Sequence, residues 1–264
     1  MRRRLIGFLL VLYAVLSVLF VARWAPRAWY PLAVPLLTLL ALIITFLHGS
    51  VHVGWRNTGV FFALSFVVSL GMETFGVRTG WAFGAYHYTQ KLTGPRFWGL
   101  VPLVIPLAWF MMMYPSWVIA RTLWQRLDGR PRGQAWKIAA LAGLAMTAWD
   151  VLMDPLMVHI GQWVWETKGG YFGIPARNFL GWWLTVFITV GLFEALAAPG
   201  PLRERKEAPL GWMVVLYGLV GGSNLALSVQ RGLTGSALAG FWAMVPWLVL
   251  GGMAVRGLQA RTGK

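Results

Sequence analysis

Eight apolar runs, separated by connections that carry most of the charged residues, make up the greater part of the sequence. Each is close to the roughly 20 residues that a helix needs to cross a hydrocarbon core of about 30 Å. The second, sixth and eighth runs are short or are interrupted by proline or glycine, so seven spans would remain if one of them did not cross. We predict an all-α fold, a polytopic membrane helix bundle of about eight transmembrane helices, forming a single integral membrane domain over residues 1–264. The runs lie near residues 5–22, 30–47, 58–76, 99–120, 135–154, 180–198, 210–228 and 237–255.

The charge of the chain fits a membrane protein better than a nucleic-acid-binding one. Only 12% of the 264 residues are charged, and the net charge is +15. The 23 Lys and Arg residues stand between the apolar runs and form no single basic face, so we expect no nucleic acid partner. With the N-terminus inside, the inner connections hold 15 of these cations and the outer ones 8. This excess predicts both termini in the cytoplasm. We expect the membrane to be a bacterial or archaeal plasma membrane.

Two of the connections are unusually long, covering roughly residues 77–98 and 155–179. Both are rich in glycine and aromatic residues. Long loops in compact proteins tend to be functional, and the predicted topology puts both on the outer face. We expect them to form the walls of a site beside the carboxylates described next.

Four of the eight acidic residues fall within or at the edge of apolar runs: Glu73, Asp150, Asp154 and Glu194. Asp150 and Asp154 are four residues apart, so a helix would project both from one face. Ionisable groups at membrane depth are costly and usually functional. In the alternative interpretation Asp154 ends a helix before Pro155 and Asp150 pairs with an arginine, while Glu73 makes an interhelical hydrogen bond. Glu194 is the weaker candidate, because it approaches the opposite end with no polar company.

The histidines and tryptophans add weaker signals. His48 and His52 have a spacing that can bind a metal, but no carboxylate accompanies them, so we predict no metal site. His87, between two tyrosines, is a better site candidate. The chain also lacks cysteine, which excludes disulfides and thiolate chemistry. Some of the 17 tryptophans belong at membrane interfaces, whereas others, near the acidic residues, could line a pocket for an apolar polyene or stabilise a carbocation.

Five segments of the sequence resemble the CruF-type carotenoid biosynthesis family, and they occur in that family's order over about residues 60–185. They are Glu73–Gly80, Phe83–Tyr88, Val101–Trp109, Trp149–Pro155 and Gly173–Trp182. Members of this family are described as carotenoid 1',2'-hydratases. The resemblance implies addition of water across the terminal carbon–carbon double bond of an acyclic or monocyclic carotenoid, giving a tertiary alcohol. It implies no cofactor, a lipophilic carotenoid and water as substrates, and other carotenoid-pathway enzymes as candidate partners in the bilayer.

This chemistry suggests roles for the candidate residues. An isolated alkene must be protonated, so we expect Asp150 or Asp154 to donate the proton and Glu73 to orient and deprotonate the water. Arg177 is a candidate to pair with a carboxylate, and Asn178 and Tyr86 to hold the water. The residues expected to bind substrate are Tyr86, His87, Trp81, Trp149, Trp163, Asn178, Arg177 and Trp182.

Three other functions stay open on the sequence alone. A membrane prenyltransferase or carotenoid elongase would use magnesium and a diphosphate donor, but it would need a second aspartate-rich motif, which the sequence lacks. A transporter would keep polar groups across the whole membrane. A non-catalytic carotenoid-binding protein would use the aromatic pocket without the acid pair.

Overall fold

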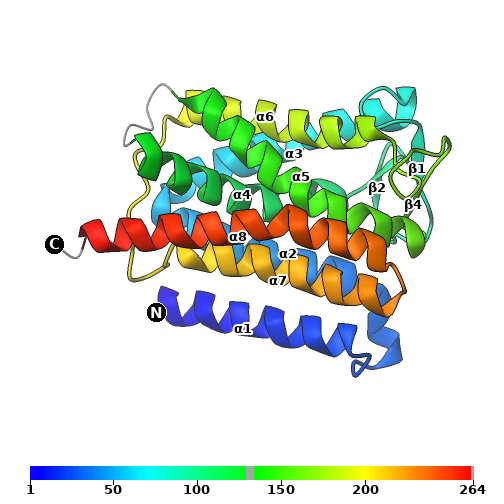
Figure 1. Ribbon diagram of the computed structural model, residues 1–264, viewed down its shortest axis with the longest axis horizontal. Helices are drawn as coiled ribbons and strands as arrows, with labels where there is room; N and C mark the ends of the chain where they lie inside the picture. Colours follow the sequence, from blue (N-terminus) through cyan, green and yellow to red (C-terminus); the bar gives the residue numbers. More distant parts are fainter. Residues whose placement is uncertain (129–133, 263–264) are drawn as a thin grey trace.

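The computed structural model describes residues 1–128 and 134–262, and within them eight helices are long and apolar enough to cross a membrane. The predicted helix bundle is therefore confirmed, with the higher of the two expected counts. Figure 1 shows both termini at the same end of the bundle, as an even number of spans requires. The helices are α1 Arg2–Val21, α2 Ala33–His52, α3 Gly54–Thr79, α4 Val104–Asp128, α5 Ala135–His159, α6 Ala176–Ala197, α7 Gly211–Gln230 and α8 Thr234–Thr262, with a short 3-10 helix at Arg27–Leu32.

Helices α4 and α5 form the centre of the bundle. We compare the most apolar 18-residue window of each helix. The buried share of this window is 83% in α4 and 67% in α5, but only 28% in α1, α2, α3 and α8. Helix α5 packs against α4, α6, α7 and α8, whereas α1 packs at the edge against α2 and α7 (Figure 1). The helix that carries the aspartate pair is thus shielded from lipid by its neighbours.

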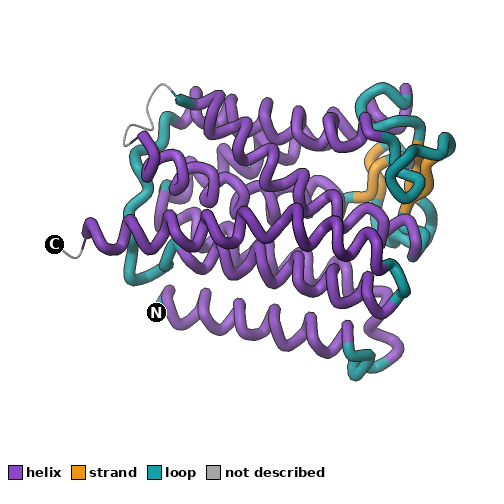
Figure 2. The backbone as a smooth tube through the Cα atoms, viewed as in Figure 1, coloured by secondary structure: helices purple, strands orange, loops and turns teal. Residues whose placement is uncertain are grey.

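Four short strands lie at the end of the bundle opposite the termini (Figure 2). β1 Tyr86–Tyr88 pairs antiparallel with β4 Trp163–Trp165, and β2 Arg96–Phe97 pairs with β3 Val101–Pro102. The two long connections seen in the sequence therefore hydrogen-bond to each other. The fourth helix begins at Val104 rather than near residue 99, because residues 101–102 are used as a strand.

Helix α5 does not end before Pro155, which corrects the interpretation of Asp154 as a helix terminus. The helix continues to His159 with Pro155 inside it. A proline has no N–H, so the carbonyl four residues earlier, that of Val151, loses its helical donor. The Tyr171 hydroxyl donates to that carbonyl at 3.0 Å. A side chain from the loop thereby replaces the missing backbone donor between the two aspartates, as membrane helices with proline require.

The charge asymmetry that predicts cytoplasmic termini stays a prediction. Arg130, Arg132 and Lys264, which contribute to the inner count, lie outside the described residues. The assignment of residues 1–264 to a single domain is likewise a prediction.

Candidate active site

The pairing of β1 with β4 builds one wall of the site. Tyr86 lies opposite Trp165, and Tyr88 lies opposite Trp163. Because successive side chains on a strand point to opposite faces, both tyrosines face the bundle and His87 between them faces outward. The ring centroids are 5.7 Å apart in the first pair and 5.8 Å in the second. The two loops thus form an aromatic layer over the helix ends.

Gly181 allows this layer to approach helix α6 closely. A Cβ atom at this position would clash with the backbone oxygen of Ala82 and would lie 2.6 Å from the Phe83 ring. The Trp165 indole N–H also donates to the backbone oxygen of Phe83 at 2.9 Å. The absence of a side chain at position 181 therefore allows close packing between α6 and the loop that leads into β1.

Glu73, on α3, is buried and receives three hydrogen bonds from neutral donors. The hydroxyls of Tyr86 and Tyr88 both donate to its Oε2, the latter at 2.7 Å. The indole N–H of Trp109, on α4, donates to Oε1 at 2.9 Å. Burial, followed by the nearby Glu73 carboxyl, raises the pKa of both tyrosines well above its usual value, so each hydroxyl keeps the proton that it donates.

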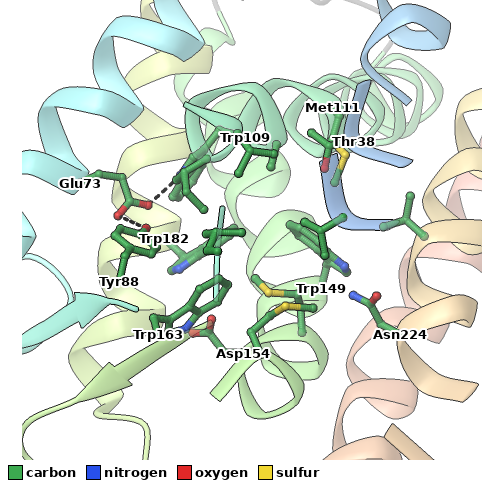
Figure 3. A pocket seen from close by; sticks show the side chains of 18 of the residues that line it. Thr38, Glu73, Tyr88, Trp109, Met111, Trp149, Asp154, Trp163, Trp182 and Asn224 are labelled. Carbon is green, nitrogen blue, oxygen red and sulfur yellow. Dashed lines mark hydrogen bonds between the residues drawn. The ribbon is translucent and has the colours of Figure 1, made fainter. Parts of the chain in front are cut away.

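Asp150 and Asp154 are both buried and share a single amide donor. Nδ2 of Asn178, on α6, donates to Oδ2 of Asp150 at 2.9 Å and to Oδ2 of Asp154 at 2.5 Å. Oδ1 of Asp150 has no hydrogen-bond partner among the residues that the structure describes. Within the described part of the chain, no cation forms an ion pair with either aspartate or with Glu73. The Trp163 indole nitrogen lies beside the Asp154 carboxyl (Figure 3). The two aspartates thus have fewer donors for each carboxyl group than Glu73, and Asp150 has only the shared amide.

A cavity of about 140 Å³ joins the two acidic groups (Figure 3). Glu73 and Asp154 both line it, and its other walls are mostly apolar. Asp150 does not line the cavity and contacts it through the shared Asn178. The Trp109 and Trp182 rings stack with centroids 4.1 Å apart, and Trp149 lies 5.8 Å from Trp182. Of the eight residues expected to bind substrate, five line this cavity: Tyr86, Trp149, Trp163, Asn178 and Trp182.

The other three do not line this cavity, and their part in binding the substrate stays a prediction. His87 faces outward from β1 and lies 3.6 Å from the exposed carboxylate of Glu166. Trp81 is 65% exposed in the turn that follows α3. Arg177 is exposed and pairs with no carboxylate, because its helical neighbour Asn178 takes the inward position in the first turn of α6. Neighbouring residues on a helix project about 100° apart, so both cannot face the cavity.

Sequence reasoning did not single out Trp109 and Tyr88, and it placed Trp165 only among the tryptophans near the acidic residues; all three line the cavity. Tyr88 and Trp165 follow the same strand alternation as Tyr86 and Trp163. Trp109 is the last residue of Val101–Trp109, one of the five segments that resemble the family, so that resemblance could have indicated it as a site residue. Its contact with Glu73 joins residues 36 positions apart, which the sequence pattern did not indicate.

Glu194 corrects a second expectation, because it does have polar company. The Arg121 guanidinium forms a buried ion pair with it, and the Trp117 indole N–H donates to Oε1 at 2.7 Å. Arg121 also donates to the backbone oxygens of Pro199 and Gly200. This cluster fastens α4 to α6 and to the connection that follows α6.

The two histidines with metal-like spacing use their nitrogens within the protein. His48 Nδ1 lies 2.9 Å from the Tyr114 hydroxyl, and His52 Nε2 lies 2.7 Å from the backbone oxygen of Ala208. Over residues 1–128 and 134–262, no group of three or more His, Asp or Glu residues is arranged to hold a metal ion. The histidines help to fix the connection before α7.

The fold and the cavity define a class: a polytopic membrane protein with three buried carboxyl groups around an apolar, tryptophan-lined site. The model of the carotenoid biosynthesis protein family matches residues 33–246, and the chain belongs to this family. The chain is also similar to bisanhydrobacterioruberin hydratase of Haloarcula japonica, with 31% identity over 173 residues. That alignment covers 64% of this chain and 57% of the relative, so the chain spans less than two thirds of the relative's length. No solved structure matches the chain.

Proposed function

We propose that this membrane protein is a carotenoid hydratase that adds water across the terminal 1',2' carbon–carbon double bond of an acyclic or monocyclic carotenoid. The product carries a tertiary hydroxyl. One observation carries the proposal: an apolar cavity is lined both by Glu73, a carboxyl group with three donors, and by Asp154, one of a carboxyl pair that shares the Asn178 amide. The similarity to a protein named as a hydratase agrees with this reading.

The aspartate pair is suited to hold the proton. Two ionised carboxylates would present four acceptor oxygens, whereas Asn178 supplies one amide group to both. A proton held between the aspartates would relieve their mutual repulsion and supply a further donor, as in other carboxyl pairs that share a proton. Asp154 lines the cavity, so it is the group that delivers the proton to the alkene, and Asp150 is the partner that supports it.

Glu73 is suited to the complementary step. Three neutral donors stabilise it as a carboxylate, which accepts hydrogen bonds only. In the proposed reaction the alkene takes a proton from Asp154, forming a tertiary cation. The oxygen of a water then bonds to that carbon while the water's second proton passes to Glu73. Proton exchange with water returns the extra proton from Glu73 to the aspartate pair, so the net reaction is addition of one water.

The aromatic walls are suited to the cation between these steps. An aromatic face attracts a nearby positive charge through its quadrupole, most strongly for tryptophan. Trp109, Trp149 and Trp182 line the cavity that the two acidic groups share. Their apolar surface also excludes bulk water, so the alkene end meets only the water that Glu73 holds.

The experiment that tests the proposal compares the wild type with Asp150→Asn in a bacterial host that accumulates acyclic carotenoids. We expect the wild type to yield pigment heavier by one water, and the variant to lose at least about a hundredfold in turnover. Glu166→Gln, the same acid-to-amide change in an exposed loop residue, is the matched control and should behave as wild type. Carotenoid that co-purifies without hydration would instead indicate a binding protein. Absence of both outcomes, with inserted and folded protein, would lead to assays of magnesium-dependent prenyl transfer.

The proposal includes a plasma membrane location with both termini in the cytoplasm. The strand-bearing end of the bundle would then face outward, with the cavity in the outer half of the membrane. Reactivity of cysteines introduced at the exposed positions 2 and 93 toward an impermeant thiol reagent tests this orientation, because the chain has no cysteine of its own.

A further inference from the structure

The cavity has a second polar end that the proposed hydration does not use. Thr38 on α2 and Ser223 and Asn224 on α7 line it, together with Tyr13 on α1. Figure 3 shows Asn224 and Thr38 across the cavity from Glu73 and Tyr88, with Trp149 between the two groups and the Asn224 amide directed toward Trp149. We call Thr38, Asn224 and the Trp149 indole N–H the amide end of the cavity.

Both ends of the cavity lie at a similar depth in the bundle. Asp154 precedes the end of α5 by five residues, and Asn224 precedes the end of α7 by six. At 1.5 Å per residue, both side chains start about 8 to 9 Å inside the same end of the bundle. The cavity therefore runs across the bundle, and a ligand that fills it contacts the acids and the amide end together.

The amide end holds polar groups that lack protein partners. The Trp149 indole nitrogen is buried, and no hydrogen-bond partner exists for it in the described residues. Among those same residues, no side-chain hydrogen bond involves Thr38, which is 3% exposed, or the Asn224 amide, which is half-buried. A buried polar group without a partner costs about 1 to 3 kcal/mol, so groups of this kind are usually satisfied by something bound.

The chemistry of these groups selects the ligand. They are a hydroxyl, an amide and an indole N–H, all neutral, and no Lys or Arg lines the cavity. An anion would want cationic partners, and a cation would want a carboxylate at this end. A neutral hydroxyl can accept from the Trp149 N–H and donate to the Asn224 carbonyl at the same time.

We propose that the amide end is a hydroxyl-binding subsite that holds either an alcohol group of the polyene substrate or a water molecule stored for hydration. The inference rests on the proposed function for its substrate, and it assigns new roles to Asn224 and Thr38.

The test compares two acyclic carotenoids, a hydrocarbon and the same chain with one hydroxyl near its end, on wild type, Asn224→Leu and Thr38→Val in lipid nanodiscs. If the subsite binds a substrate alcohol, the ratio of kcat/KM for the hydroxylated over the hydrocarbon substrate should fall about tenfold in each variant, equivalent to about 1.4 kcal/mol. If it holds water, kcat should fall by a similar factor on both substrates while KM stays constant.

The matched control is Asn57→Leu, the same change on membrane helix α3 at a residue that does not line the cavity. Variants that match this control on both substrates, or that raise KM equally for both, would overturn the subsite. Quenching of tryptophan fluorescence by each carotenoid gives an affinity that does not require turnover. A wild type that prefers to bind the hydroxylated chain, with the preference lost in Asn224→Leu, would support the subsite even if hydration itself were not observed.

Discussion

Two buried carboxylate clusters lie at opposite ends of helix α6 and differ in what compensates them. Asn178 and Glu194 are 16 residues apart on this helix, or about 24 Å. At the Glu194 end, Arg121 supplies a full positive charge and Trp117 a further donor. At the Asn178 end, two aspartates share a single neutral amide, and a cavity opens beside them.

We propose that this difference separates a structural carboxylate from a reactive one. Glu194 has its hydrogen-bonding capacity used by a cation and lines no part of the site cavity, so it can fasten helices but can do little chemistry. The aspartates have spare acceptor capacity, no cation and access to an apolar space. A buried charge that remains uncompensated is costly, which is why such groups at membrane depth are usually kept for a function. The following predictions test this contrast, beginning with the largest expected effect.

The largest difference should appear between Asp154→Asn and Glu194→Gln. Asp154→Asn should lower the hydration rate at least about a hundredfold, because the amide cannot donate a carboxyl proton. Its unfolding temperature should not fall, since one of two like acidic groups is removed. Glu194→Gln should show the reverse pattern, with turnover largely kept and stability lost. Pigment mass and thermal unfolding in detergent measure the two effects, and equal loss of turnover in both variants would contradict the contrast.

Removing Arg121 should destabilise the protein by about 3 kcal/mol or more, because Glu194 is left buried without its cation. Arg121→Leu with Glu194→Leu should recover most of this loss, since neither charge then remains. Thermal unfolding of the single and double variants measures the interaction. A double variant no more stable than Arg121→Leu alone would argue against the ion pair as the main contribution.

Tyr88→Phe should lower turnover about tenfold, because one of three donors to Glu73 is lost. Tyr30→Phe is the matched control, since that hydroxyl has no hydrogen-bond partner in the described residues. Burial raises the pKa of Tyr86 and Tyr88 well above the usual value of about 10, so neither donor is lost as the pH rises toward it. Activity should therefore show no tyrosine ionisation between about pH 8 and pH 10. A pH profile of the wild type checks this.

The smallest effect concerns Pro155, which directly follows the second aspartate. Tyr171→Phe should cost about 1 kcal/mol of stability, because the Val151 carbonyl loses its donor. In a Pro155→Ala background the same change should cost less, since the alanine that replaces the proline can supply the helical N–H. A double-mutant cycle in thermal unfolding measures the coupling, and strict additivity would show that the tyrosine does not replace the proline's missing donor.

The candidate site divides into residues that local pattern could predict and residues that it could not. The spacing of Asp150 and Asp154 predicts one helix face, and strand alternation explains why Tyr86 and Tyr88 face inward while His87 does not. The contacts of Asn178 with the aspartates and of Trp109 with Glu73 join separate helices. Contacts between separate helices cannot be predicted from the residue periodicity of either helix alone. The ion pair of Arg121 with Glu194 was missed for the same reason.

By itself the sequence determined the membrane-spanning bundle. A span is recognised from about 20 consecutive apolar residues, and this does not depend on how the helices are arranged. The sequence also determined which carboxyl groups would lie at membrane depth. Only the tertiary structure decided which of them is compensated, because hydrogen-bond donors and cations come from helices far apart in the chain. It likewise decided that the two loops pair to enclose one cavity, with acids at one end and an amide at the other.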